Sequence, residues 1–161
     1  MYYSDLPLFI KPKTASVSGH RILKRDFSEE KLKYDLKNII LSGYEYFLIG
    51  MAKGFDCACF SALIKLKEEF DYIKLVAVIP CLDQTVKFNK KEKEIYETLL
   101  KSTDYKVIIK ETYEEGCMLK RNDFMVENSS LLYAYYSGIK KGGTYYTVRR
   151  AEKDGLKVIL Y

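Results

Sequence analysis

The chain has 161 residues, of which 48% are hydrophobic and 30% are charged, and its formal net charge is +5. These values are typical of one soluble globular domain and argue against two independent domains, and no apolar run approaches the roughly 20 residues that a membrane span requires. The positive charge comes largely from lysines that alternate with glutamates, so it admits a polyanionic partner without arguing for one.

We predict that residues 1–13 are an N-terminal extension and that residues 14–161 form a single domain. The apolar stretch at residues 7–10 is too short for a signal peptide and has neither a basic start nor a small-residue cleavage site. The cysteines do not have the spacing of a secreted disulfide framework or of a zinc finger, so we interpret them as reduced, mostly buried thiols: Cys57, Cys59, Cys81 and Cys117. We therefore expect a cytoplasmic protein without a metal ion and without a membrane partner.

Short apolar runs alternate with helical windows along the chain. The runs are rich in β-branched or aromatic residues and predict strands at residues 15–18, 46–49, 73–80, 105–109, 131–136 and 157–160. Apolar residues at helical spacing predict helices at residues 28–41, 56–69, 91–101, 118–128 and 144–154. This alternation favours right-handed crossovers, and hence a doubly wound three-layer α/β/α sandwich with a mainly parallel sheet of about six strands.

In such a sheet, ligands bind beyond the carboxyl ends of the strands, and two glycine-rich turns are predicted there. Gly50 and Gly54 flank Met51, Ala52 and Lys53 directly after a strand, so backbone amides can approach an anion. Asp56 then opens a helix, either as its N-cap or as a partner of a ribose hydroxyl, and it is a weak candidate for a catalytic acid or base.

The second turn consists of Gly142, Gly143 and Thr144 and also leads from a strand into a helix. Glycine amides, the helix dipole and the threonine hydroxyl converge there, which favours a phosphate site. The alternative is a flexible loop in which Thr144 is the N-cap. The loop at residues 80–89 is a candidate flap.

Arg121 and Asn122 lie on the same helical stripe as Met118 and Met125, which predicts that both polar side chains face inward. A buried arginine needs a partner. We interpret Arg121 as lying at the mouth of a cleft, where it meets an anionic ligand; the alternative is an ion pair with a carboxylate such as Asp56.

Gly19, His20 and Arg21 follow the first strand, and we favour Arg21 as a cation of the site and a structural role for the lone histidine. Tyrosines near the second glycine turn could stack on a base or simply pack: Tyr133, Tyr135, Tyr136, Tyr145 and Tyr146.

Taken together, these motifs resemble the YpsA-like branch of the SLOG superfamily of Rossmann-like proteins, from about residue 14 to the C-terminus. The motifs are Ser18-Gly19-His20-Arg21, Gly50-Met-Ala-Lys-Gly54-Phe-Asp56, Val78-Ile-Pro80-Cys81, Gly116-Cys117-Met118, Lys120-Arg121-Asn122 and Gly142-Gly143-Thr144. The resemblance implies a Rossmann-like sheet with a pocket for a nucleotide-derived ligand such as ADP-ribose or an NAD-derived molecule. It implies no settled reaction.

Two related groups define the alternatives. DprA has a similar glycine pattern with Arg-Asn and binds single-stranded DNA, whereas LOG phosphoribohydrolases need a glutamate three residues after the threonine of their glycine motif. Thr147 occupies that position in this chain, which argues against LOG-type hydrolysis.

Our first hypothesis is therefore a nucleotide-binding or sensing protein. The second is an enzyme that uses Asp56 on an N-glycosidic or phosphoester bond, and the third is DprA-like binding of single-stranded DNA. Exposed tyrosines would also suit a homodimer interface.

Overall fold

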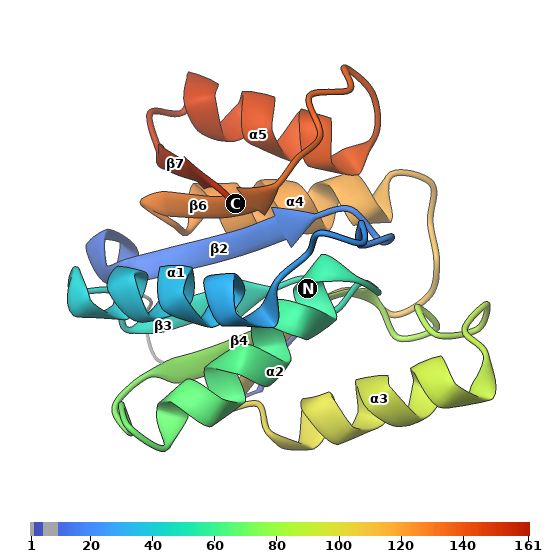
Figure 1. The fold of residues 1–161 in the computed structure, drawn as a ribbon. Helices are drawn as coiled ribbons and strands as arrows, with labels where there is room; N and C mark the ends of the chain where they lie inside the picture. The colour runs from blue at the N-terminus through green and yellow to red at the C-terminus, as the bar shows by residue number, and fades with distance from the viewer. Residues whose placement is uncertain (1, 5–9) are drawn as a thin grey trace.

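A computed structural model of the protein describes residues 2–4 and 10–161. Its strands are β1 (Tyr2–Ser4), β2 (Thr14–Gly19), β3 (Tyr46–Ile49), β4 (Lys74–Cys81), β5 (Tyr105–Lys110), β6 (Leu131–Tyr135) and β7 (Lys157–Leu160). Its α-helices are α1 (Glu29–Leu41), α2 (Phe55–Lys67), α3 (Lys90–Lys101), α4 (Cys117–Glu127) and α5 (Gly143–Lys153), and a 3-10 turn (Lys11–Lys13) precedes β2 (Figure 1). None of the helices described is long and apolar enough to cross a membrane.

Local signals in the sequence set where the helices begin. The Ser28 hydroxyl oxygen accepts a hydrogen bond from the Lys31 backbone N–H at 3.1 Å and caps α1. At the start of α3, Asn89 and Glu92 each accept a hydrogen bond from the other's backbone N–H, which forms a capping box. By contrast, α2, α4 and α5 begin after Gly54, Gly116 and Gly142, without a side-chain cap. The first amide of α2 donates to the His20 carbonyl oxygen at 3.2 Å, and that of α4 donates to the Glu114 carbonyl oxygen at 3.0 Å. The first amides of α5 have no side-chain cap, so they remain open to other partners.

The strands form one sheet in the order β1-β5-β4-β3-β2-β6-β7. Strands β2 to β7 are parallel to their neighbours, and β1 pairs with β5 in the antiparallel direction. This arrangement confirms the predicted doubly wound α/β fold. From β2 the chain runs outward through β3, β4 and β5, and then returns to place β6 on the other side of β2. The strand order therefore reverses between β2 and β6, and this is where such folds bind ligands.

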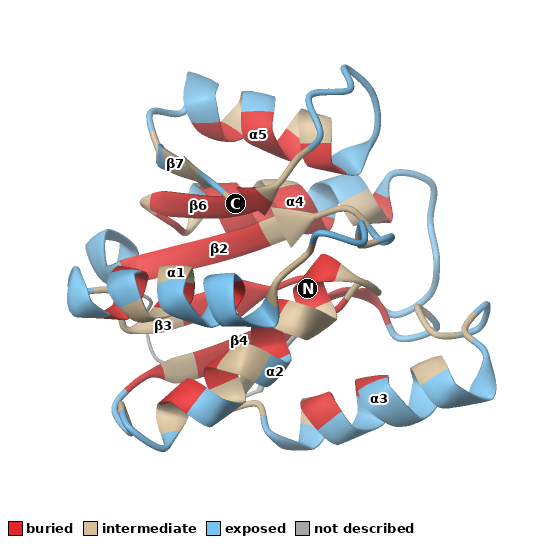
Figure 2. Cartoon of the chain, viewed as in Figure 1, coloured by how far each residue is buried: buried red, intermediate tan, exposed pale blue. Residues whose placement is uncertain are grey.

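Both faces of the sheet are covered by helices (Figures 1 and 2). Side chains alternate between two cores along each strand, as Phe47 and Leu48 of β3 show: Phe47 belongs to the core under α1, α2 and α3, and Leu48 to the core under α4. A third cluster joins β6 to α4 and α5. Burial on both faces explains why the central strands are continuous apolar runs.

The strand β1 is not among the elements that we predicted, because residues 2–4 were assigned to the N-terminal extension. Its three residues pair with the outer edge of β5, from Tyr2 opposite Ile108 to Ser4 opposite Lys106. Such pairing covers part of an otherwise open sheet edge.

Candidate functional site

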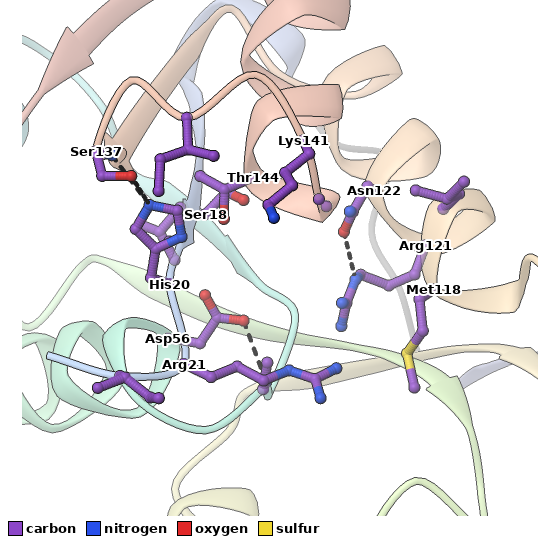
Figure 3. Close-up of a pocket in the computed structure, with 18 of the residues that line it drawn as sticks. Ser18, His20, Arg21, Asp56, Met118, Arg121, Asn122, Ser137, Lys141 and Thr144 are labelled. Atoms are coloured by element: carbon purple, nitrogen blue, oxygen red, sulfur yellow. Dashed lines mark hydrogen bonds between the residues drawn. The ribbon is translucent and has the colours of Figure 1, made fainter.

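A cleft of about 650 Å³ opens at the carboxyl ends of β2 and β6 (Figure 3). Its walls come from the segment after β2, from the first turns of α2, α4 and α5, and from the loop between β6 and α5. Most of the predicted binding residues line it: Gly19, Arg21, Ala52, Asp56, Arg121, Asn122, Gly142, Gly143 and Thr144. The cleft therefore lies at the reversal of strand order, where the fold class predicts a ligand.

Arg121 on α4 lines the cleft and is only 5% exposed. Its Nε donates a hydrogen bond to Asn122 Oδ1 at 2.7 Å, and its Nη1 donates to the carbonyl oxygen of Gly50. Both acceptors are uncharged, and the described part of the chain contains no salt bridge to Arg121, so the predicted alternative of an ion pair with Asp56 is wrong. Burial lowers the pKa of Arg121, although the carboxyl group of Asp56 acts in the opposite direction. Arg121 therefore lacks a directly bonded carboxylate, although the charge of Asp56 acts on it from nearby.

Asp56 lies in the first turn of α2 and is 5% exposed. Its Oδ2 accepts a hydrogen bond from the Ala52 backbone N–H at 3.1 Å, which closes the turn between β3 and α2 (Figure 3). The alternative in which Asp56 is the N-cap is wrong, because Gly54 holds that position. Burial raises the pKa of Asp56 to about 6, against the opposing effects of Arg121, the Ala52 amide and Arg21. This carboxyl group can therefore gain or lose a proton close to neutral pH.

Three predicted residues, Gly50, Met51 and Gly54, do not line the cleft but shape the turn behind it. Gly50 leaves room for the guanidinium of Arg121, since a Cβ there would overlap it. Met51 is buried and has a φ of 62°, and Gly54 has a φ of +77° and lies against the backbone of Arg21. The glycines of this motif therefore position Arg121 and Arg21 through close packing. The sequence pattern alone could not distinguish this role from direct contact with a ligand.

The second glycine turn lines the opposite wall of the cleft. Gly142 adopts a φ of +91°, and α5 begins at Gly143. Thr144 makes no capping hydrogen bond, so the alternative in which it is the N-cap is wrong. Asn122 Nδ2 lies 3.7 Å from the point where a Cβ of Gly143 would be. The side-chain amide from α4 and the open backbone amides of α5 therefore face a common space, as an anion site requires.

His20 lines the cleft and also forms contacts between two loops, so the structural role that we favour for it stays a prediction. Its Nε2 accepts a hydrogen bond from the Ser137 backbone N–H at 3.0 Å and lies 3.1 Å from the Ser137 hydroxyl oxygen (Figure 3). It thus ties the segment after β2 to the loop after β6. The neighbouring Gly19 packs against the ring of Phe55, and Arg21 is exposed, without a hydrogen bond or salt bridge from its side chain within the described part of the chain.

Several cleft residues were not predicted. They include the cations Lys24 and Lys141 and the apolar side chains of Met118, Leu119 and Ile139. The only sequence signal for the two lysines was that each follows the end of a strand. Many surface lysines share this feature, so it does not single them out. The five tyrosines near the second glycine turn do not line the cleft, and Tyr133 and Tyr135 pack instead against Phe55.

A family model described as the YspA SLOG family matches residues 20–158. A UPF0398 protein from Bacillus pumilus is 28% identical over 161 residues, which cover 92% of this chain and 87% of the relative. A UPF0398 protein from Bacillus velezensis is 26% identical over 153 residues, which cover 88% of this chain and 84% of the relative. These matches confirm the predicted resemblance.

Two solved structures share the fold. DNA processing protein A (DprA) from Streptococcus pneumoniae superposes with a TM-score of 0.69 at 23% identity, over 95% of this chain and 51% of that protein. DprA from Helicobacter pylori, a protein that binds single-stranded DNA, superposes with a TM-score of 0.68 at 18% identity, over 95% of this chain and 66% of that protein. This chain therefore spans between half and two thirds of the DprA chains.

Proposed function

The chain belongs to the YspA SLOG family, and from that premise we propose that its cleft binds the phosphate group of a nucleotide or nucleotide-derived ligand. The observation that supports this most strongly is the pair of arginines. Arg21 and Arg121 both line the cleft, where Asp56 is the one acid, and neither arginine forms a salt bridge in the described part of the chain. A phosphate between them would relieve the repulsion and accept several hydrogen bonds.

The opposite wall supports the same function. The backbone amides of Gly143 and Thr144 lie at the N-terminus of α5, where the helix dipole favours negative charge. Asp56 and the side-chain NH₂ of Asn122 are among the polar groups that could orient a ribose or a base. We also propose a cytoplasmic location, which is compatible with the four free cysteines.

Calorimetric titration with ADP, ADP-ribose and NAD tests the proposal. We expect at least one of them to bind, and we expect Arg121→Ala to weaken that binding by about tenfold or more, because a charge-assisted hydrogen bond is lost. Arg149→Ala is the matched control, since it removes the same charge from an exposed position on α5. Absence of heat with all three compounds, or equal weakening by both variants, would contradict the proposal.

A hydrolase or transferase is the second candidate, and the carboxyl group of Asp56 favours it, because a pKa of about 6 suits a general acid or base. Thr147 cannot replace the LOG glutamate, since it is 1% exposed and donates its hydroxyl to the Gly143 carbonyl oxygen at 2.8 Å. Incubation with nucleotides, followed by chromatography, decides the question. Turnover that disappears in Asp56→Asn supports an enzyme, and intact nucleotide throughout rejects it.

Binding of single-stranded DNA is the third candidate, favoured by the fold shared with DprA and by Lys24 and Lys141 beside the cleft. Phosphate contacts release counterions, so this binding should weaken steeply as the salt concentration rises. Retardation in a gel that is absent or independent of salt would reject it. A homodimer also stays a prediction, which sedimentation analysis can test.

A further inference from the structure

A second cavity of about 520 Å³ adjoins the cleft, with which it shares Arg21, Ala52 and Met118. It extends from these residues to the loop between β4 and α3 and to Tyr113 in the loop after β5. In Figure 3, the guanidinium of Arg21 reaches toward Met118, the residue of α4 at the boundary between the two hollows. A ligand whose phosphates contact Arg21 can therefore extend into both.

Gln84 in this second cavity has an unused hydrogen-bond acceptor. Its Nε2 donates to the carbonyl oxygens of Gly50, at 3.4 Å, and Met51, at 3.2 Å. Reversing the side-chain amide would place Oε1 against two carbonyl oxygens, so the hydrogen bonds fix its orientation. Oε1 is then buried without a donor, and it is the one such buried side-chain atom in the described part of the chain. An unsatisfied buried acceptor is costly, and because this oxygen is closed to solvent, an N–H group from a ligand would satisfy it after a small movement of the Gln84 side chain.

The rest of the lining suits a flat ring. Phe88 and Tyr113 provide aromatic surface, and Tyr113 and Val86 are 61% and 69% exposed, so apolar area remains uncovered. Arg21 and Lys87 supply positive charge beside Asp83, the one acid among the lining residues, whereas the third cation, Lys53, is already paired with Glu92 at 3.2 Å. Aromatic side chains and cations in one hollow are what a nucleobase next to a phosphate requires.

We propose that this second cavity is a subsite for a second ring-bearing end of the ligand, with an N–H donor directed at Gln84 Oε1. The preferred ligand is then a dinucleotide in which two nucleosides are joined by a pyrophosphate held between Arg21 and Arg121. This inference rests on the proposed function, because it assumes that the phosphates bind in the first cleft.

Three probes separate the two subsites: ADP, ADP-ribose and the symmetric compound diadenosine diphosphate. The symmetric compound presents the same ring at both ends, so the direction of binding does not matter, and ADP-ribose has the pyrophosphate but no second base. We expect diadenosine diphosphate to bind about tenfold more tightly than ADP or ADP-ribose, the gain typical of one stacked base. Tyr113→Ala should remove that gain and leave the affinity for ADP unchanged.

Tyr34→Ala is the matched control, because Tyr34 is a similarly exposed tyrosine on α1, away from both cavities. Equal affinities of the wild-type protein for the three probes, or a Tyr113→Ala effect no larger than that of Tyr34→Ala, would overturn the subsite and leave the proposed function intact. Failure of all three probes to bind would overturn both. Tighter binding of a single-stranded oligonucleotide than of diadenosine diphosphate would also overturn the subsite.

A second readout needs no substitution. Gln84 is the only glutamine in the sequence, so selective ¹⁵N-glutamine labelling gives a single side-chain amide signal. We expect diadenosine diphosphate to shift this signal and ADP-ribose to leave it nearly unchanged. Equal shifts with the two compounds would contradict a subsite for the second base.

Discussion

The positive charges of the cleft side chains outnumber the negative charges. Asp56 carries the one carboxyl group among the cleft residues, where Arg21 and Arg121 are accompanied by Lys24 and Lys141. Because burial favours the neutral form of Asp56, the site becomes more positive as the pH falls through about 6. The side chains of the cleft thus carry an excess of positive charge at neutral pH and below.

The protonation of the Asp56 carboxyl group should change the stability of the protein with pH. The pKa of Asp56 is about 6 in the folded chain and 3.8 in its ordinary state, so folding favours the protonated form. The contribution to the unfolding free energy is complete below pH 4 and is lost as the pH rises through about 6. Two pKa units correspond to about 3 kcal/mol. We expect Asp56→Asn to remove this decline in denaturant titrations from pH 4 to pH 7.

Asp71→Asn is the control, since it makes the same chemical change at an exposed position. If the unfolding free energy of Asp56→Asn falls with pH as steeply as that of the wild-type protein, Asp56 does not titrate in this range.

Gly54 offers a test of the packing role that we assign to the first glycine turn. Its φ of +77° is strained for other residues, and a Cβ would also collide with the backbone of Arg21. We expect Gly54→Ala to lower the unfolding free energy by more than about 2 kcal/mol. Gly155→Ala has a similar φ of +80° but open space around the Cβ, so it should cost only about 1 kcal/mol. Thermal denaturation measures both variants. If they lose equal stability, the backbone near Arg21 moves to accommodate the added Cβ, and the packing role of Gly54 is contradicted.

At the level of residues, the sequence predicted well which side chains lie in the cleft. It predicted less well what each of them contacts. The helical spacing of Arg121 and Asn122 predicted that both face inward, and both are buried. The role of Gly54 was not predictable, because its requirement comes from the backbone of Arg21, a contact between separate loops. For the same reason nothing marked Gln84, whose unsatisfied oxygen depends on the turn around Gly50.

At the level of elements, the cleft depends on how α4 and α5 are held together, since each provides one wall. Arg150 on α5 pairs with Asp123 at 2.7 Å and Glu127 at 2.9 Å on α4, and with Asp154 at 3.1 Å. Two of these acceptors lie on α4, so one guanidinium bridges the helices at two points and restrains the angle between them better than an isolated surface pair does.

We expect Arg150→Met to lower the unfolding free energy by about 1 to 2 kcal/mol, because the partly buried network is lost while the apolar stem is retained. Arg149→Met should change stability by less than about 0.5 kcal/mol, since its one ion pair, with Glu152, is long at 3.8 Å and exposed. Chemical denaturation measures both values. Equal losses would contradict a specific role for the Arg150 network.

The predicted elements agree closely with those observed because the central strands and amphipathic helices carry strong local periodicity. Two features lie beyond this local periodicity: α5 begins at Gly143, one residue before the predicted start, and the strand β1 was not predicted. A three-residue strand has no readable pattern, and its pairing with β5 is fixed by the open edge of a sheet that forms from distant segments.

At the level of the whole molecule, the doubly wound topology converts remote segments into one site. The segment after β2, the start of α2, Arg121 on α4 and the turn before α5 meet at the reversal of strand order. This convergence was predictable, because the carboxyl ends of parallel strands share one edge. The second cavity was not predictable, since it requires the loop at residues 82–89 to fold beside Tyr113.

A crystal structure of the protein grown with a saturating concentration of ADP tests the proposed phosphate site most directly. We predict electron density for the phosphates within hydrogen-bonding distance of the Arg121 guanidinium and of the backbone amides of Gly143 and Thr144. A bound ADP whose phosphates lie elsewhere, with these groups left facing solvent, would contradict the proposal.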